Sequence, residues 1–107
     1  MSLQDWVRDG WASQHKCTRD EIHRLLALAD RDLGSCATKG LATDWRFAIA
    51  YNAALQSATS ALAAAGYRAS HEAHHLRVIQ SLSFTIGASR ELIRRFDAFR
   101  KKRNMSS

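Results

Sequence analysis

The residues best suited to chemistry in this sequence are basic side chains near its C-terminus. Residues 90–107 hold seven basic and two acidic residues, so they carry +5 of the chain's net charge of +6. Arginine can bind two phosphate oxygens at once, and a cluster of cations attracts a polyanion by releasing its counterions. Cations at the C-terminal end of a helix also stabilise the helix dipole, which is a purely structural role. The cluster comprises Arg90, Arg94, Arg95, Arg100, Lys101, Lys102 and Arg103, followed by Asn104.

Three histidines, His71, His74 and His75, form a second group. Spacings of three and four residues would place His71 on the same helix face as the other two. Such a face can hold a metal ion, but Glu72 is the one further ligand close by, so we expect no metal and no cofactor. A solvent-facing or bundle-capping role is one reading of the group. General acid or base chemistry is another, because imidazole titrates near neutrality.

A third group of polar residues falls in the longest predicted helix. Asn52 lies on the apolar stripe of that helix, and a buried Asn often fixes register or pairs across an interface. A substrate contact is the alternative. The group comprises Asp44, Arg46, Tyr51, Asn52 and Gln56.

Helices must position all three groups, because the chain has no proline and alanine and leucine dominate its apolar residues. Sustained alternation is absent from the sequence and no Asn-Gly or Asp-Gly hairpin is recognised, so no strand is expected. We predict an all-α fold, a four- to five-helix up-down bundle that dimerises. One domain spans residues 1–107, with a leader segment at 1–17 and the bundle at 18–107.

Capping signals divide the chain into helices. Thr18 and Glu21 form a capping-box pattern, and Lys39-Gly40 would end the helix that it starts. Thr43 or Asp44 would cap the longest helix, and Gly66 suits the left-handed position after it, with Tyr67 packing back on Leu62. The predicted stripes of these two helices are Ile22, Leu25, Leu26, Ala29, Leu33 and Cys36, and then Trp45, Ala48, Asn52, Leu55, Thr59 and Leu62.

Three shorter predictions complete the secondary structure. Residues 3–14 would form a leading helix anchored by Trp6 and Trp11, which, like Trp45, we assign to the core. Ser70 would cap a fourth helix, and Gly87-Ala88-Ser89 would break it. The last helix would place Leu92, Ile93, Phe96 and Phe99 in the core.

Cellular location is also constrained by the sequence. No stretch of about eighteen apolar residues exists, and residues 1–5 do not resemble a signal peptide. Cys17 and Cys36 are far apart in the sequence and follow no paired spacing. We therefore expect a cytoplasmic protein with reduced thiols and no membrane partner.

Several of these segments, taken in order, resemble the HEPN family. Residues 44–56 resemble its second core helix, and residues 63–68, Ala-Ala-Ala-Gly-Tyr-Arg, resemble the end of that helix. Residues 74–75 and 79–80 resemble the next segment of small bacterial members. Residues 102–104, Lys-Arg-Asn, resemble the start of the family's hallmark motif. The resemblance spans residues 20 to 104.

The resemblance implies a dimer that cleaves RNA without metal, as the toxin-like partner of a minimal nucleotidyltransferase antitoxin. It assigns Arg103 and Asn104 to the opening of the catalytic motif, and the role does not pass to His74 or His75, which do not match the family's catalytic position. The sequence reaches Ser107 without the His or Tyr that closes the motif, so we expect this chain to cleave poorly. The RNA-binding residues would be Arg95, Arg100, Lys101, Lys102 and Arg103.

Two alternatives stay open at the level of sequence. One is a non-catalytic dimeric interaction or accessory module of the same fold. The other is a basic helical protein that binds nucleic acid through charge alone.

Overall fold

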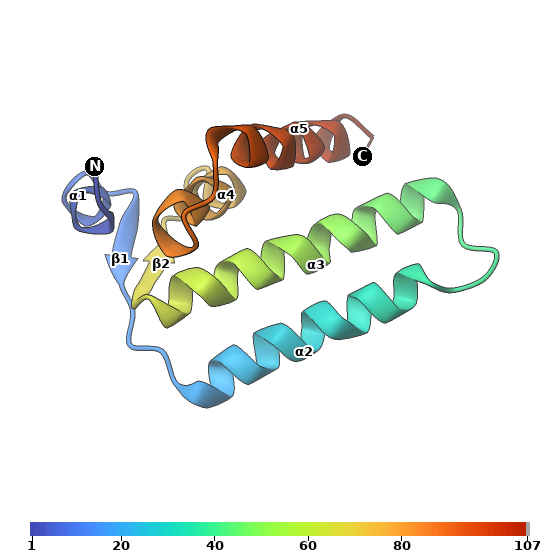
Figure 1. Ribbon diagram of the computed structural model, residues 1–107, viewed down its shortest axis with the longest axis horizontal. Helices are drawn as coiled ribbons and strands as arrows, with labels where there is room; N and C mark the ends of the chain where they lie inside the picture. Colours follow the sequence, from blue (N-terminus) through green and yellow to red (C-terminus); the bar gives the residue numbers. More distant parts are fainter. Residues whose placement is uncertain (107) are drawn as a thin grey trace.

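A computed structural model describes residues 1–106 of the chain. The structure is mostly helical, with one small antiparallel ribbon of two strands in the described part (Figure 1). The elements in chain order are α1 (Leu3–Arg8), β1 (Ala12–Gln14), α2 (Arg19–Cys36), α3 (Thr43–Ala64), β2 (Tyr67–Ala69), α4 (His74–Thr85) and α5 (Arg90–Ser106).

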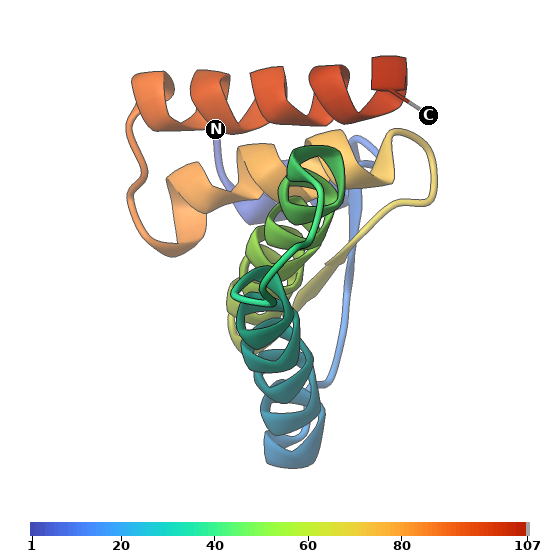
Figure 2. The same ribbon diagram turned by 90° about the vertical axis from the view of Figure 1, so that its right-hand side faces the viewer.

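The four long helices form two pairs. Helices α2 and α3 run antiparallel along the long axis of the molecule (Figure 1), and α4 and α5 form a second pair that crosses α3 (Figure 2). Among these helices, α3 contacts each of the other three, and most closely α2 and α4. The predicted helical fold is therefore confirmed, but the axes of the two pairs cross instead of aligning in one bundle.

Helix α3 occupies the centre because small side chains on its surface let its neighbours approach closely. Ala58 and Leu62 belong to a buried cluster that also includes residues of β2 and α4. The placement of Trp45 in the core was wrong, since its side chain is 65 % exposed. Trp45 lies in the first turn of α3, at the end of the molecule where α2 and α3 project alone (Figure 1). The cluster comprises Ala58, Leu62, Ala69, Val78 and Leu82.

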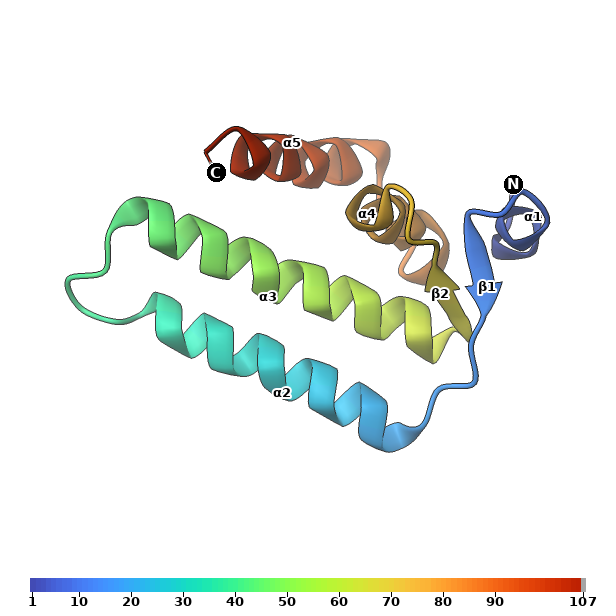
Figure 3. The ribbon, with the colours of Figure 1, turned by 180° about the vertical axis from the view of Figure 1, so that it is seen from behind.

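Helix α2 is less buried than its predicted stripe suggested. Ala29 is its one buried residue in the described part of the chain, while Leu26 and Leu33 are exposed. The physical reason is that α2 packs chiefly against α3 and has no helix on its outer side (Figure 3).

The ribbon corrects the prediction that the chain has no strand. Strand β1 pairs with β2 in antiparallel register, with Ala12 opposite Ala69. The predicted helix over residues 3–14 ends at Arg8, and Gly10 then turns the chain with φ +80°. Strands of three residues are too short to show alternation, so the sequence pattern could not reveal them.

The ribbon also joins the predicted leader segment to the rest of the fold. Trp6 is buried, as predicted, and its ring meets Phe84 of α4 edge-on at 5.3 Å between centroids. The guanidinium of Arg77 lies 3.7 Å from the centre of the Trp11 ring, a cation–π contact. Residues 1–17 are thus part of the folded unit.

Helix ends show which capping predictions hold. Gly66 has φ +96° and its amide donates to the Ala63 carbonyl at 2.9 Å, as the prediction for the end of α3 requires. Ala42, not Thr43 or Asp44, is the N-cap of α3.

Helix α4 also begins later than the sequence predicted. Ser70 lies at the end of the ribbon, where its amide donates to the Trp11 carbonyl at 3.0 Å, so it cannot cap α4. The residue before α4 is Ala73, with a left-handed φ of +53°. Among the described residues, no helix combines the length and the apolar character needed to cross a bilayer.

Candidate nucleic-acid interface

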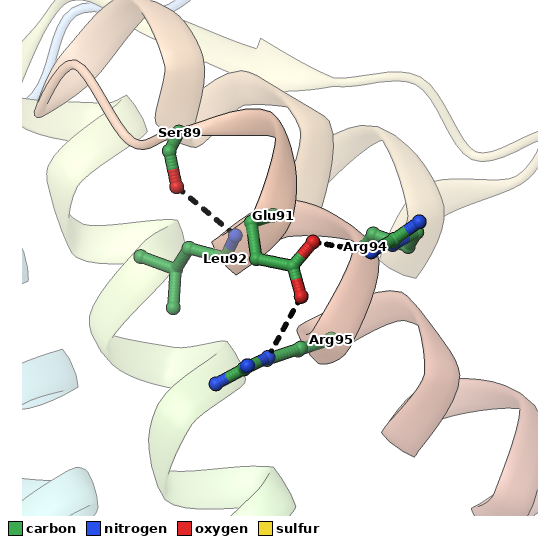
Figure 4. Close-up of polar contacts among 5 residues, drawn as sticks. All are labelled: Ser89, Glu91, Leu92, Arg94 and Arg95. Atoms are coloured by element: carbon green, nitrogen blue, oxygen red, sulfur yellow. Dashed lines mark hydrogen bonds and ion pairs between the residues drawn. The ribbon is translucent and has the colours of Figure 1, made fainter.

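Helix α5 carries every residue that the sequence assigned to RNA binding or catalysis. Its start is fixed by Ser89, whose hydroxyl accepts a hydrogen bond from the Leu92 amide at 3.1 Å (Figure 4). Ile93 and Phe96 pack against the buried cluster. The prediction that Leu92 and Phe99 are core residues was wrong, because both side chains are about half exposed.

The first half of the basic cluster is partly neutralised. Glu91 forms ion pairs with both Arg94 and Arg95, so one carboxylate lies between two guanidinium groups (Figure 4). Both arginine side chains remain largely exposed. Exposed pairs of this kind are weak, so an RNA phosphate can compete for these arginines.

The second half of the cluster is organised by Asp97. Its carboxylate lies 2.6 Å from Nε of Arg100 and 3.5 Å from Nζ of Lys101. The Arg100–Asp97 pair is mostly buried, with each side chain about one-fifth exposed. Lys101 is exposed, whereas Nζ of Lys102 lies 5.2 Å from the centre of the Phe47 ring on α3.

The C-terminal end of the cluster meets α3 and α4 at Tyr51. The guanidinium carbon of Arg103 lies 5.5 Å from the centre of the Tyr51 ring, and the His75 ring lies 6.2 Å from it. Phe96 closes the other side of the tyrosine at 5.9 Å. We call Tyr51, His75, Arg100 and Arg103 the Tyr51 junction.

Burial and neighbouring charges set the protonation of the junction. Burial lowers the pKa of His75, and the positive charges of His74, Arg103 and Arg100 lower it further. Burial raises the pKa of the Tyr51 hydroxyl. His75 is therefore a neutral imidazole near pH 7, able to accept a proton.

Two buried polar atoms at the junction are unsatisfied. Within residues 1–106, the Tyr51 hydroxyl and Nε of Arg103 have no hydrogen-bond partner. Trp6, Gln56 and Ser60 also carry such atoms, so this feature is shared with positions outside the junction.

Tyr51 also lines a groove between α3 and α5. The groove has a volume of about 460 Å³, and its walls are almost entirely apolar. Arg95 is the one charged residue on its walls. The groove is lined by Phe47, Ala50, Tyr51, Ala54, Leu92, Arg95, Phe96 and Phe99.

The structure separates the three histidines that the sequence grouped together. His71 lies in the turn before α4 and is exposed, so the shared helix face predicted for it was wrong. Nδ1 of His74 lies 3.0 Å from the Ser70 carbonyl, at the first turn of α4. His75 alone reaches the Tyr51 junction.

The sequence marked Tyr51 and His75 as candidates in two separate groups, and no pattern in it paired either residue with Arg103. Asn104 is exposed on the last turns of α5. Of the polar group on α3, Gln56 donates to Asp32 of α2 at 3.2 Å, and Asn52 is half-buried. The one signal in the sequence was the four-residue spacing of Phe47 and Tyr51. This spacing places two aromatic residues on the same face of the helix and so favours an inward position for Tyr51.

Comparisons with known proteins give no assignment. No protein-family model matches the chain, and no match is found among curated proteins or solved structures.

Proposed function

We propose that the chain is a HEPN-like RNA-binding protein that holds RNA phosphates on the C-terminal half of α5. The observation that carries this proposal is the Tyr51 junction, where the end of the basic helix meets a neutral histidine and a tyrosine. The resemblance of the sequence to HEPN proteins supports the same function. We also propose that its protein partner is a nucleotidyltransferase antitoxin.

In the proposed reaction, His75 accepts the proton of a ribose 2′-hydroxyl, which attacks the adjacent phosphorus. Arg103 stabilises the negative charge that develops on the phosphoryl oxygens. The bond to the 5′ oxygen breaks, and that oxygen takes a proton from water. The hydroxide that is left takes the proton from His75, which returns to its neutral form. The products are a 2′,3′-cyclic phosphate and a 5′-hydroxyl. The family resemblance does not assign this role to His75. What supports it is the contact of His75 with Tyr51, which also contacts Arg103.

Binding is tested by measuring affinity for single-stranded RNA at several salt concentrations. The charge reversal Lys101→Glu with Lys102→Glu should weaken binding to all sequences. It should also lower the slope of log affinity against log salt by roughly 0.7 for each phosphate that the variant no longer binds. The matched control is Arg19→Glu with Arg24→Glu, which makes the same change of net charge on exposed positions of α2.

Loss of affinity in the α5 variant alone supports the proposal. Equal loss in both variants would show that net charge and not this surface attracts RNA. An absence of salt-dependent binding by the parent chain would remove RNA as the ligand.

A second candidate function is a dimeric interaction module, which the exposed apolar groove favours. A second copy of the chain, packed on the groove, would cover Leu92 and Phe99 and bring two basic helices together. Light scattering at micromolar concentration should then give twice the chain mass of 12.0 kDa. Phe99→Asp should yield the monomer, whereas Leu33→Asp, at an equally exposed position of α2, should not. A parent mass of one chain would exclude this dimer.

A further inference from the structure

The end of the ribbon and the start of α2 bring together three residues that the RNA-binding proposal does not use. His15 directly follows β1, and its amide donates to the Gly66 carbonyl at 2.8 Å. Glu21 lies in the first turn of α2, where its amide donates to the Thr18 hydroxyl at 3.1 Å. The backbone is thus held on both sides of Cys17, which lies between the ribbon and the helix.

The side chains of these residues converge. Nε2 of His15 lies 2.7 Å from the carboxylate of Glu21. The metal-binding atoms of His15, Cys17 and Glu21 all lie within 4.8 Å of one another, and all three residues are partly buried. Glu21 therefore turns toward His15, although the sequence predicted that its carboxylate would complete a capping box with Thr18.

The donor set has a clear chemical preference. It offers one imidazole nitrogen, one sulfur and one carboxylate oxygen, which are the three ligand types that Zn²⁺ accepts. A thiolate ligand disfavours Mg²⁺ and Ca²⁺, which take oxygen ligands. A tetrahedral zinc site needs ligand atoms about 3.4 Å apart, so shifts of about 1 Å would complete it.

We propose that His15, Cys17 and Glu21 bind one Zn²⁺ ion at the surface of the molecule. Three protein ligands leave a fourth position for water or an exogenous ligand, as in catalytic zinc sites. A cavity of about 190 Å³ beside the cluster gives that position room. Its walls include His15, Glu21, Thr59, Tyr67, Arg68 and His74.

Hydrogen bonds within the cluster affect the protonation of Glu21 and Cys17. Hydrogen bonds from Cys17 and His15 lower the pKa of Glu21, and the bond to Glu21 raises the pKa of the Cys17 thiol. Zinc must therefore displace the thiol proton, as it does at other cysteine sites. The cation Arg68 lies near Glu21 and opposes a second positive charge, so the site should be of moderate affinity.

The expectation of no metal rested on His71, His74 and His75, beside which Glu72 is the one further ligand in the sequence. The three residues of the cluster lie in the segment His15-Lys16-Cys17-Thr18-Arg19-Asp20-Glu21. That spacing matches no common zinc motif. The turn between β1 and α2 brings the two ends of this segment, His15 and Glu21, together.

The site is tested by titrating the untagged, reduced chain with Co²⁺, which reports a thiolate ligand through a sulfur-to-cobalt charge-transfer band. Competition with Zn²⁺ then gives the zinc affinity. We expect one equivalent to bind with this band. Cys17→Ser should abolish the band and weaken zinc binding roughly 10-fold or more. Glu21→Gln should also weaken binding.

Cys36→Ser is the matched control, because Cys36 is the other free, partly buried cysteine of the described chain. It should bind like the parent, as should His71→Ala, which changes an exposed histidine outside the cluster. Circular dichroism establishes that each variant is folded. Binding without the charge-transfer band, equal binding by Cys17→Ser, or loss of the band in Cys36→Ser would overturn the proposal. These outcomes do not depend on RNA binding.

Discussion

Helices α3 and α5 have similar lengths but opposite relations to the core. Six residues of α3 are buried, whereas α5 has no fully buried residue among its described side chains, residues 90–104. Helix α3 contributes Leu62, which is 1 % exposed. Helix α5 contributes charge, and its apolar residues are half exposed or only partly covered.

The difference teaches that stability and ligand binding are carried by different helices. Changes in α3 should unfold the protein, and changes in the cations of α5 should alter binding while leaving the fold intact. Tyr51 is the exception, since it lies on α3 and also contacts Arg103.

The largest effect should come from Leu62→Ala in α3. Removing a fully buried leucine side chain should lower the free energy of unfolding by about 2–5 kcal/mol. The corresponding change in α5, Phe99→Ala, should cost less than about 1 kcal/mol in dilute monomeric protein. Urea unfolding followed by circular dichroism measures both. Equal losses would show that α5 is as much a part of the core as α3.

A second large effect is expected on cleavage, which the proposed role of His75 allows although the family motif alone predicts poor activity. Arg103→Ala should lower the cleavage rate by roughly 100-fold, the scale for removal of one transition-state stabiliser. Arg90→Ala, an exposed arginine at the other end of α5, should leave the rate near that of the parent. Cleavage of end-labelled RNA with analysis of the product ends provides the measurement. An unchanged rate in the Arg103 variant would contradict the catalytic part of the proposal.

A smaller effect is expected from the cap of α5. Ser89→Ala removes the side-chain acceptor of the Leu92 amide and should cost about 1 kcal/mol. Ser83→Ala, an exposed serine of α4, should change stability by less than about 0.5 kcal/mol. Thermal melts of the two variants distinguish a helix that depends on its cap from one that does not.

The smallest effect concerns pH. Burial places the pKa of His75 in the folded protein below its usual value of 6.5, so the unfolded chain binds more protons below that pH. The stability contributed by neutral His75 is complete above pH 6.5 and is lost as the pH falls through the folded pKa. Stability should therefore decline on acidification in this range.

His75→Asn should make this decline shallower. The charged groups that face His75 are His74 on its own helix and Arg100 and Arg103 on α5. His71→Asn changes an exposed histidine and should retain the slope of the parent. Denaturant titrations between pH 5 and 7.5 supply the slopes. A parent slope in the His75 variant would show that other groups govern the decline.

The sequence predicted those features of the fold that depend on residues close together in the chain. The start of α2, the Gly66 ending of α3 and the break before α5 follow from local capping chemistry. The predicted end of α2 at Lys39-Gly40 was wrong, because the helix ends at Cys36 with Ala37 as its C-cap. The basic cluster was also predictable, because its members fall within residues 90–103 and lie on one helix. No comparison tests the HEPN resemblance, which stays a prediction.

The remaining features depend on contacts between distant segments. Ala12 meets Ala69 through backbone hydrogen bonds that leave no trace in side-chain pattern. Trp45 has an ideal core residue type, yet its side chain in the first turn of α3 is exposed. His75 and Arg103 share Tyr51 because α4 and α5 cross α3, which residue spacing cannot reveal.

The pairing of β1 with β2 has a consequence for how the chain folds. This pairing joins Ala12 to Ala69 and so closes a long loop that contains the whole α2–α3 hairpin. Closing a long loop costs more chain entropy than forming a local contact. We expect the helical hairpin to form early and the ribbon, with Trp6, to join late. Substitutions at Trp6 should then mainly accelerate unfolding and scarcely change the folding rate.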